Sequence, residues 1–177
     1  MLERFPLAFA IRAPETDETA LPGELPSALV RRLALAKARA VSATNPGAVI
    51  IGSDQVAEYQ DRIVGKPGSL EKAAEQLASF SGKTVNFLSA FALVCEQSGF
   101  LFQRTVLTEV VFRQLDEEEI QRYLALDKPF DCAGSFRSEA NGPALLTRMS
   151  SPDPTAIMGL PMIELAQGLR MAGYVLP

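Results

Sequence analysis

Two long β-rich segments place the strongest constraint on the fold of this chain. Residues 84–96 and 100–113 are rich in Phe, Val, Leu and Thr, which are residue types that favour strands. The short connection between them contains Ser98-Gly99, a pair that is typical of turns between antiparallel strands. The sequence therefore predicts a long β-hairpin.

Helical patterns and shorter strands alternate around this hairpin. The pattern of residues 27–44, with Val30, Leu33, Lys37 and Val41 on one face, predicts a helix. Further helices are predicted over 69–79, 116–126 and 161–172, the first two capped by Ser69 and Asp116. Strands are predicted over 7–13, 48–51 and 144–149, with a short hairpin over 56–64.

This interleaving predicts an α/β fold with a mixed, twisted sheet flanked by helices. A length of 177 residues suits one domain, 1–177, rather than two large ones. The segment 14–26 holds three prolines and several acidic residues, and it is expected to be an exposed loop.

The overall charge and the cysteine content narrow the class of protein. A net charge of −4 argues against a protein that binds long nucleic acid, because the binding surfaces of such proteins usually carry an excess of basic residues. No apolar stretch is long enough for a membrane span, and the first residues lack the pattern of a signal peptide. The two cysteines have neither disulfide nor metal-site spacing. A cytoplasmic protein without membrane partners is therefore expected.

The complete absence of histidine is the most useful functional signal in the composition. It excludes Ser-His-Asp and Cys-His mechanisms, because histidine is the general base in both. An enzyme of this composition would have to use carboxylates, lysines, arginines and an oxygen-preferring cation such as Mg²⁺. That set of groups suggests phosphate chemistry.

Three residues stand out as candidates for such chemistry. Asp54 follows the apolar run 48–51, at the carboxyl end of a predicted buried strand where ligands bind in open α/β sheets. It suits a general base or a metal ligand, and otherwise it is a turn or cap residue. Lys66, in a rigid Gly-Lys-Pro corner, can neutralise a phosphate or be a solvated loop lysine. Lys37 is functional only if its helix faces the same cleft, since its stem can also reach solvent.

Polar segments offer weaker candidates. Arg137 and Glu139 can contact a phosphate and a base edge, or they can serve solubility alone. Asp17 and Glu18 can bind a metal or ribose, or form a solvated acidic surface. Cys132 has no histidine to activate it and is expected to be a small buried residue.

Seven short motifs together resemble the Maf family, from about Leu7 to the end of the chain. They occur in the family's order and with suitable spacing, and they are LALAKARAV (33–41), IIGSDQV (50–56), GKP (65–67), SGKT (81–84), VVFRQL (110–115), CAGSF (132–136) and MGLPM (158–162).

The resemblance implies a Maf/ITPase-like fold and a pyrophosphatase that depends on a divalent cation, Mg²⁺ or Mn²⁺. Such an enzyme splits a nucleoside triphosphate into monophosphate and pyrophosphate, with water as the nucleophile, and a homodimer is common in the family. By resemblance Asp54 is the catalytic base and a metal ligand. Lys37 and Lys66 match phosphate-facing lysines, and Glu18 matches a loop acid.

Two further positions bear on the substrate. Family members selective for dTTP and UTP tend to have Thr and Gln where this chain has Gln55 and Glu139. The pair found here resembles the subgroup that acts on 7-methyl-GTP, and a glutamate suits both the donors of guanine and the positive charge of an N7-methylated base. The expected function is removal of a modified nucleotide. A dTTP/UTP or broader nucleotide pyrophosphatase is the alternative within the same class.

One departure from the family pattern is an absent motif. The family opens with a strand and a Ser-x-Ser-Pro-x-Arg-Arg turn that grips phosphate, and neither is recognised in this sequence. The resemblance therefore implies an N-terminally truncated chain whose sheet lacks the first strand. A catalytically impaired nucleotide-binding or cell-division regulatory module is the alternative from a different class.

Overall fold

A computed structural model describes residues 1–177 and contains one five-stranded sheet. The strands lie in the order β2-β1-β3-β4-β5, and every neighbouring pair is antiparallel. Their bounds are Ile50–Tyr59 (β1), Arg62–Val64 (β2), Thr84–Cys95 (β3), Phe100–Phe112 (β4) and Leu146–Ser150 (β5).

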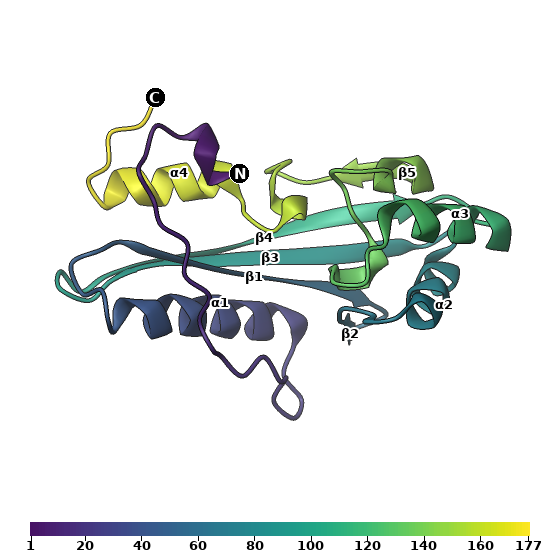
Figure 1. Ribbon diagram of the computed structural model, residues 1–177, viewed down its shortest axis with the longest axis horizontal. Coiled ribbons are helices and arrows are strands. Elements are labelled where there is room, and N and C mark those ends of the chain that lie inside the picture. The colour runs from purple at the N-terminus through teal and green to yellow at the C-terminus, as the bar shows by residue number, and fades with distance from the viewer.

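Helices cover both faces of this sheet (Figure 1). The α-helices are α1 (Pro26–Ser42), α2 (Leu70–Phe80), α3 (Glu117–Asp127) and α4 (Met162–Met171), and the short 3₁₀ helices are η1 (Leu2–Arg4), η2 (Ala133–Ser135), η3 (Gly142–Leu145) and η4 (Ala156–Met158). Helix α1 lies along one face, whereas α4 and η4 lie on the other, and α2 and α3 pack together at the far end.

The side chains of β1 divide between these two faces because successive residues of a strand point in opposite directions. Gly52, Asp54 and Val56 face α1, and this side is called the α1 face. Ser53 and Gln55 face η4, and this side is called the η4 face.

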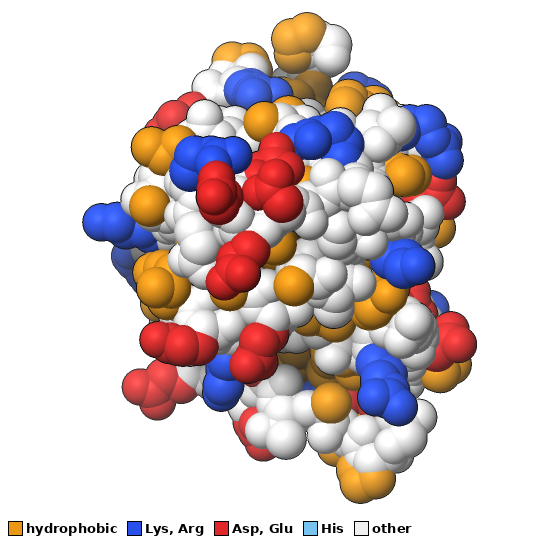
Figure 2. Space-filling model, turned by 90° about the vertical axis from the view of Figure 1, so that its right-hand side faces the viewer, with side chains coloured by type: hydrophobic (Ala, Val, Ile, Leu, Met, Phe, Trp, Pro, Cys, Tyr) orange, Lys and Arg blue, Asp and Glu red, His pale blue; other side chains and the backbone are white.

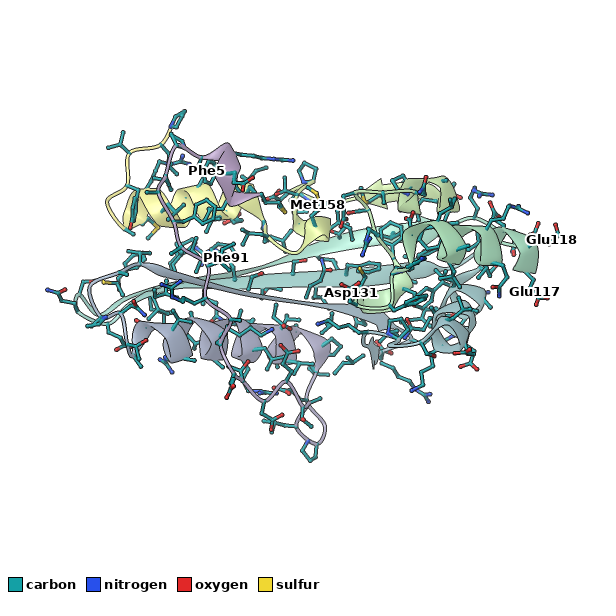
Figure 3. All side chains as sticks on the ribbon, in the orientation of Figure 1. Phe5, Phe91, Glu117, Glu118, Asp131 and Met158 are labelled. Atoms are coloured by element: carbon teal, nitrogen blue, oxygen red, sulfur yellow. The ribbon has the colours of Figure 1, made fainter.

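The long hairpin of β3 and β4 forms the centre of the sheet, as the sequence predicts. Its strands pair without interruption from Thr84 opposite Val111 to Cys95 opposite Phe100. Phe91 of β3 packs in the apolar cluster under α4, which Phe5 of the N-terminal segment also joins (Figure 3). The hairpin and the two ends of the chain therefore share one part of the core.

Helix α1 lies unusually close to β1 at Gly52. A Cβ atom there would lie 2.3 Å from the carbonyl oxygen of Ala34 and 2.5 Å from the amide nitrogen of Ala38. Only glycine permits this approach, which brings Lys37, in the turn between Ala34 and Ala38, into contact with Asp54.

Most predicted elements are confirmed, including the caps. Ser69 and Asp116 accept hydrogen bonds from the backbone N–H groups of Lys72 and Glu119, which satisfies free donors at the starts of α2 and α3. The predicted helices 27–44 and 161–172 correspond to α1 and α4 within two residues at each end.

Three predictions about the sheet are wrong in part. The α/β organisation is confirmed, but the sheet is antiparallel rather than mixed, because β1 runs back along β3. The predicted strand 7–13 has no regular structure, since no strand lies alongside to accept its hydrogen bonds. Strand β1 continues through the polar residues 52–55 instead of ending at 51, because partners on both faces satisfy those side chains.

The outer edge of β1 is partly open. Strand β2 pairs only with residues 57–59 of β1, and no strand lies on the outer side of residues 50–56. None of the helices combines the length and the apolar character needed to cross a membrane.

Candidate active site

Lys37 joins two carboxylates on the α1 face. Its Nζ lies 2.7 Å from Oδ1 of Asp54 and 2.5 Å from Oε1 of Glu18. The side chain of Asp54 is only 9% exposed and that of Lys37 is 19% exposed, whereas Glu18 is half exposed. The structure therefore brings together three of the six predicted site residues.

The sequence explains two of these positions. Lys37 belongs to the stripe of α1 that faces the sheet, and Val30 and Leu33 of the same stripe are buried. Asp54 is two residues from Gly52 and points to the same face of β1. Lys37 therefore points toward Asp54 of the sheet instead of extending to solvent alone.

Glu18 reaches the cluster because Arg32 holds the acidic loop against α1. The guanidinium of Arg32 donates two hydrogen bonds of 2.7 Å to the carboxylate of Glu24 and one of 3.0 Å to the carbonyl of Thr19. A bidentate Arg–carboxylate pair fixes orientation as well as position. Sequence reasoning missed Arg32, because no periodicity links it to a loop acid eight residues earlier.

The pKa directions at the cluster follow from burial and charge. Burial raises the pKa of Asp54 above its ordinary value, although the hydrogen bond from Lys37 opposes the change. Burial alone would lower the pKa of Lys37, but its bonds to Asp54 and Glu18 raise it overall. The Lys37 hydrogen bond lowers the pKa of Glu18. Lys37 therefore stays charged, and Asp54 is a stronger base than a free aspartate.

Lys66 lies near this cluster without a direct contact. It is exposed beyond the end of β2. Its positive charge adds to the effect of Lys37 in lowering the pKa of Glu18, and it opposes in part the effect of burial, which raises the pKa of Asp54. The preceding carbonyl, of Gly65, accepts hydrogen bonds from the backbone of Gly134 at 3.4 Å and from Nε2 of Gln76 at 3.2 Å. These bonds fix the Gly-Lys-Pro corner and leave the lysine available to an anion.

Gln55 lies on the opposite face of β1 from Asp54. Its Nε2 donates to Oγ of Ser89 at 2.8 Å and to the carbonyls of Ile157 at 2.9 Å and Ala156 at 3.2 Å. Asp54 and Gln55 are neighbours in the motif IIGSDQV, but the structure places them on opposite faces of the sheet. Adjacent residues of a strand alternate between faces.

Glu139 lies in the exposed loop that follows η2, and η2 itself packs on the side of the sheet that Gln55 faces. Its carboxylate lies 3.9 Å from Nε of Arg137, and no hydrogen bond joins it to Gln55. Arg137 also contacts Asp131, which Figure 3 shows beside the sheet. The loop begins over Ala57 of β1, where a Cβ on Gly134 would be 3.0 Å away.

Cys132 and Asp17 do not join the site. Cys132 is half-buried rather than buried, because its thiol lies at the loop surface beside Asp131 and Arg137, and burial raises its pKa. Asp17 is exposed and accepts a hydrogen bond from the backbone N–H of Thr19 within the acidic loop.

The carboxylates of the site suit a divalent cation that is bound partly by the substrate. The structure contains no group of three or more His, Cys, Asp or Glu side chains arranged so that they could hold a metal ion. Glu18 and Asp54 supply two carboxylates, and Mg²⁺ is commonly held by one or two carboxylates together with substrate phosphates. These two residues therefore fit a cation that arrives with a phosphorylated ligand.

The end of the molecule formed by α2 and α3 carries charges of both signs. Acidic and basic side chains are interspersed there without a continuous basic area (Figure 2). Glu117 and Glu118 of the acidic first turn of α3 point outward at this end (Figure 3).

Known proteins resemble this chain over nearly its whole length. It is 48% identical over 176 residues to a 7-methyl-GTP pyrophosphatase of Polaromonas sp.. The aligned residues are 99% of this chain and 80% of that protein. The proteins of the same name from Aromatoleum aromaticum and Xanthomonas campestris pv. campestris are 48% and 49% identical over 177 residues, which cover 100% of this chain and 91% and 92% of theirs.

A family model assigns the chain to a family independently of any one relative. The model described as "Maf-like protein" matches residues 1–172, which is almost the entire chain. The chain belongs to the Maf family.

Proposed function

We propose that this protein is a nucleoside triphosphate pyrophosphatase that hydrolyses 7-methyl-GTP to 7-methyl-GMP and diphosphate. The observation that carries the proposal is the pairing of a buried carboxylate, Asp54, with Lys37 on the α1 face. Relatives at about 48% identity over the full chain are named for this activity.

The chemistry of the site follows from the positions of its charges. Asp54 takes a proton from a water molecule, whose oxygen attacks the α-phosphorus, and the bond to the diphosphate leaving group breaks. Burial raises the pKa of Asp54, which makes its carboxylate a better proton acceptor. Lys37 and Lys66 stabilise the negative charge that develops on the phosphates.

Glu18 and Asp54 would hold Mg²⁺ or Mn²⁺ together with phosphate oxygens of the substrate. When bound, such a cation adds positive charge beside the phosphates. Lys37 holds the two carboxylates close to each other, since its Nζ contacts both.

The substrate spans the open edge of β1 in this proposal. The phosphates lie on the α1 face with Lys37, and the base lies on the η4 face with Gln55 and Glu139. The edge of residues 50–56 has no strand on its outer side, so backbone groups there remain free to bind the nucleotide. The Glu139 carboxylate accepts hydrogen bonds from the guanine N1–H and exocyclic amine, and its charge favours the cationic N7-methylated base.

The test is pyrophosphate release from 7-methyl-GTP, GTP, dTTP and UTP with Mg²⁺ or Mn²⁺. We expect 7-methyl-GTP to be turned over fastest, and Asp54→Ala to abolish turnover of all four. Equal turnover by Asp54→Ala would remove the assigned base, and a preference for dTTP or UTP would contradict the substrate. Nucleotide binding without turnover would instead favour a regulatory module.

A further inference from the structure

Ser89 is a buried hydroxyl with an unusual set of partners. It is completely buried on β3, directly opposite Gln55 in the strand register. Its Oγ donates to the carbonyl oxygen of Ala156 at 2.6 Å and accepts from Nε2 of Gln55 at 2.8 Å. A buried hydroxyl is costly unless it is bonded, and here both of its capacities are used.

These bonds decide which way the Gln55 amide points. The terminal atom that faces η4 lies 2.9 Å from the carbonyl of Ile157 and 3.2 Å from that of Ala156. Carbonyl oxygens only accept hydrogen bonds, so this atom must be the nitrogen. Because the Ser89 hydroxyl donates its hydrogen bond to the carbonyl of Ala156, it presents a lone pair to Gln55. The Gln55 atom that faces this lone pair must be a donor, which again is the amide nitrogen.

The remaining atom of the amide, Oε1, accepts no hydrogen bond from the protein, and the Gln55 side chain is partly exposed. Gln55 therefore offers a substrate an acceptor and no donor. Glu139 likewise offers only acceptors when ionised. The guanine edge carries adjacent donors at N1 and at the exocyclic amine, whereas uracil and thymine carry one N–H between two carbonyl oxygens.

We propose that Ser89 is a positioning residue for substrate selection, which together with the carbonyls of Ala156 and Ile157 holds the Gln55 amide with Oε1 toward the base and so favours guanine over pyrimidine. This proposal rests on the proposed function, in which Gln55 contacts the base. A rotated amide would present its NH₂ group and match the carbonyl oxygens of a pyrimidine instead.

The chain supplies a matched control in Thr108. This residue is also completely buried on the same face, and its Oγ1 donates to Oγ of Ser151, in the loop that leads to η4. Thr108→Val removes a buried hydroxyl bond to that loop without touching Gln55. It separates loss of loop anchoring from loss of amide orientation.

The experiment compares the unmodified protein with Ser89→Ala, Thr108→Val and Gln55→Leu. The ratio of kcat/KM for 7-methyl-GTP to that for dTTP is measured for each, with thermal unfolding to verify folding. We expect Ser89→Ala to lower the ratio about two- to tenfold, the equivalent of one hydrogen bond, while Thr108→Val leaves it unchanged. Gln55→Leu should lower it at least as much as Ser89→Ala.

Each contrary outcome has a distinct meaning. An unchanged ratio in Ser89→Ala, or an equal fall in Thr108→Val, overturns the positioning role while the proposed function stands. An unchanged ratio in Gln55→Leu overturns it as well, because the amide would then not read the base. Absence of any preference for 7-methyl-GTP in the unmodified protein contradicts the proposed function itself.

Discussion

The two faces of β1 use polar residues in different ways. On the α1 face, Asp54, Lys37 and Glu18 form a charged cluster, and one member comes from a loop. On the η4 face, Gln55 and Ser89 are neutral and bonded to backbone carbonyls. Charges on the α1 face suit the phosphates and the proton transfer, whereas the fixed neutral pair Gln55–Ser89, together with the carboxylate of Glu139, suits discrimination between bases. Variants on the two faces should therefore fail in different ways.

The largest effect is expected from Asp54→Asn. Loss of the general base should lower kcat about 10²- to 10⁴-fold for every nucleotide, without changing the preference among them. The unmodified protein should lose activity as falling pH protonates Asp54, at a pH above its ordinary pKa of 3.8 because burial raises that pKa. Pyrophosphate release across a pH series measures both effects. A changed nucleotide preference would contradict the division between faces.

Gly52→Ala should disturb the α1 face as a whole. The new Cβ would collide with the backbone of α1 at Ala34 and Ala38, so we expect the free energy of unfolding to fall by about 1–3 kcal/mol. Urea denaturation measures this change. Gly65→Ala is the control, because a Cβ at Gly65 meets no atom within 4 Å and its backbone φ is not positive. Equal destabilisation by both variants would contradict the close approach.

Lys37→Met should leave Asp54 buried without its cation. We expect a loss of about 1–3 kcal/mol in the free energy of unfolding at neutral pH. The difference from the unmodified protein should shrink at low pH, where Asp54 is protonated. It should also shrink at high pH, because the raised pKa of Lys37 means that its contribution is complete below 10.5 and is lost as Lys37 deprotonates.

The double variant Lys37→Met/Asp54→Asn tests whether this loss belongs to the pair. It should cost less than the sum of the single changes, since no uncompensated charge remains. Denaturant titration of all four proteins gives the coupling, and strict additivity would mean that the two side chains do not interact.

The smallest effect is expected from Glu24→Gln, which weakens the bonds between the acidic loop and Arg32. Hydrogen bonds from Arg32 lower the pKa of Glu24 to about 2, so its stabilisation is complete above the ordinary value of 4.5 and is lost as pH falls toward 2. The variant should be less stable at neutral pH and equal to the unmodified protein near pH 2. Thermal unfolding over this range measures the difference, and a pH-independent difference would contradict it.

Local signals in the sequence predicted most elements because they act within a few residues. Ser69 and Asp116 cap helices through donors three residues ahead, and Ser98-Gly99 closes a hairpin between segments that already favour strands. Such signals do not depend on the rest of the fold. They could not predict that segment 7–13 lacks a partner strand, because that depends on what lies beside it.

The sequence by itself determined most of the elements, the family and the chemical types of the site residues: a chain without histidine that carries Lys37, Asp54 and Lys66 in the Maf motifs. Only the tertiary structure decided how those residues are divided. The antiparallel register of β1 and β3 sets Gln55 against Ser89, and the close approach of α1 sets Lys37 against Asp54. Contacts between residues distant in the chain depend on register and packing, which no local pattern encodes.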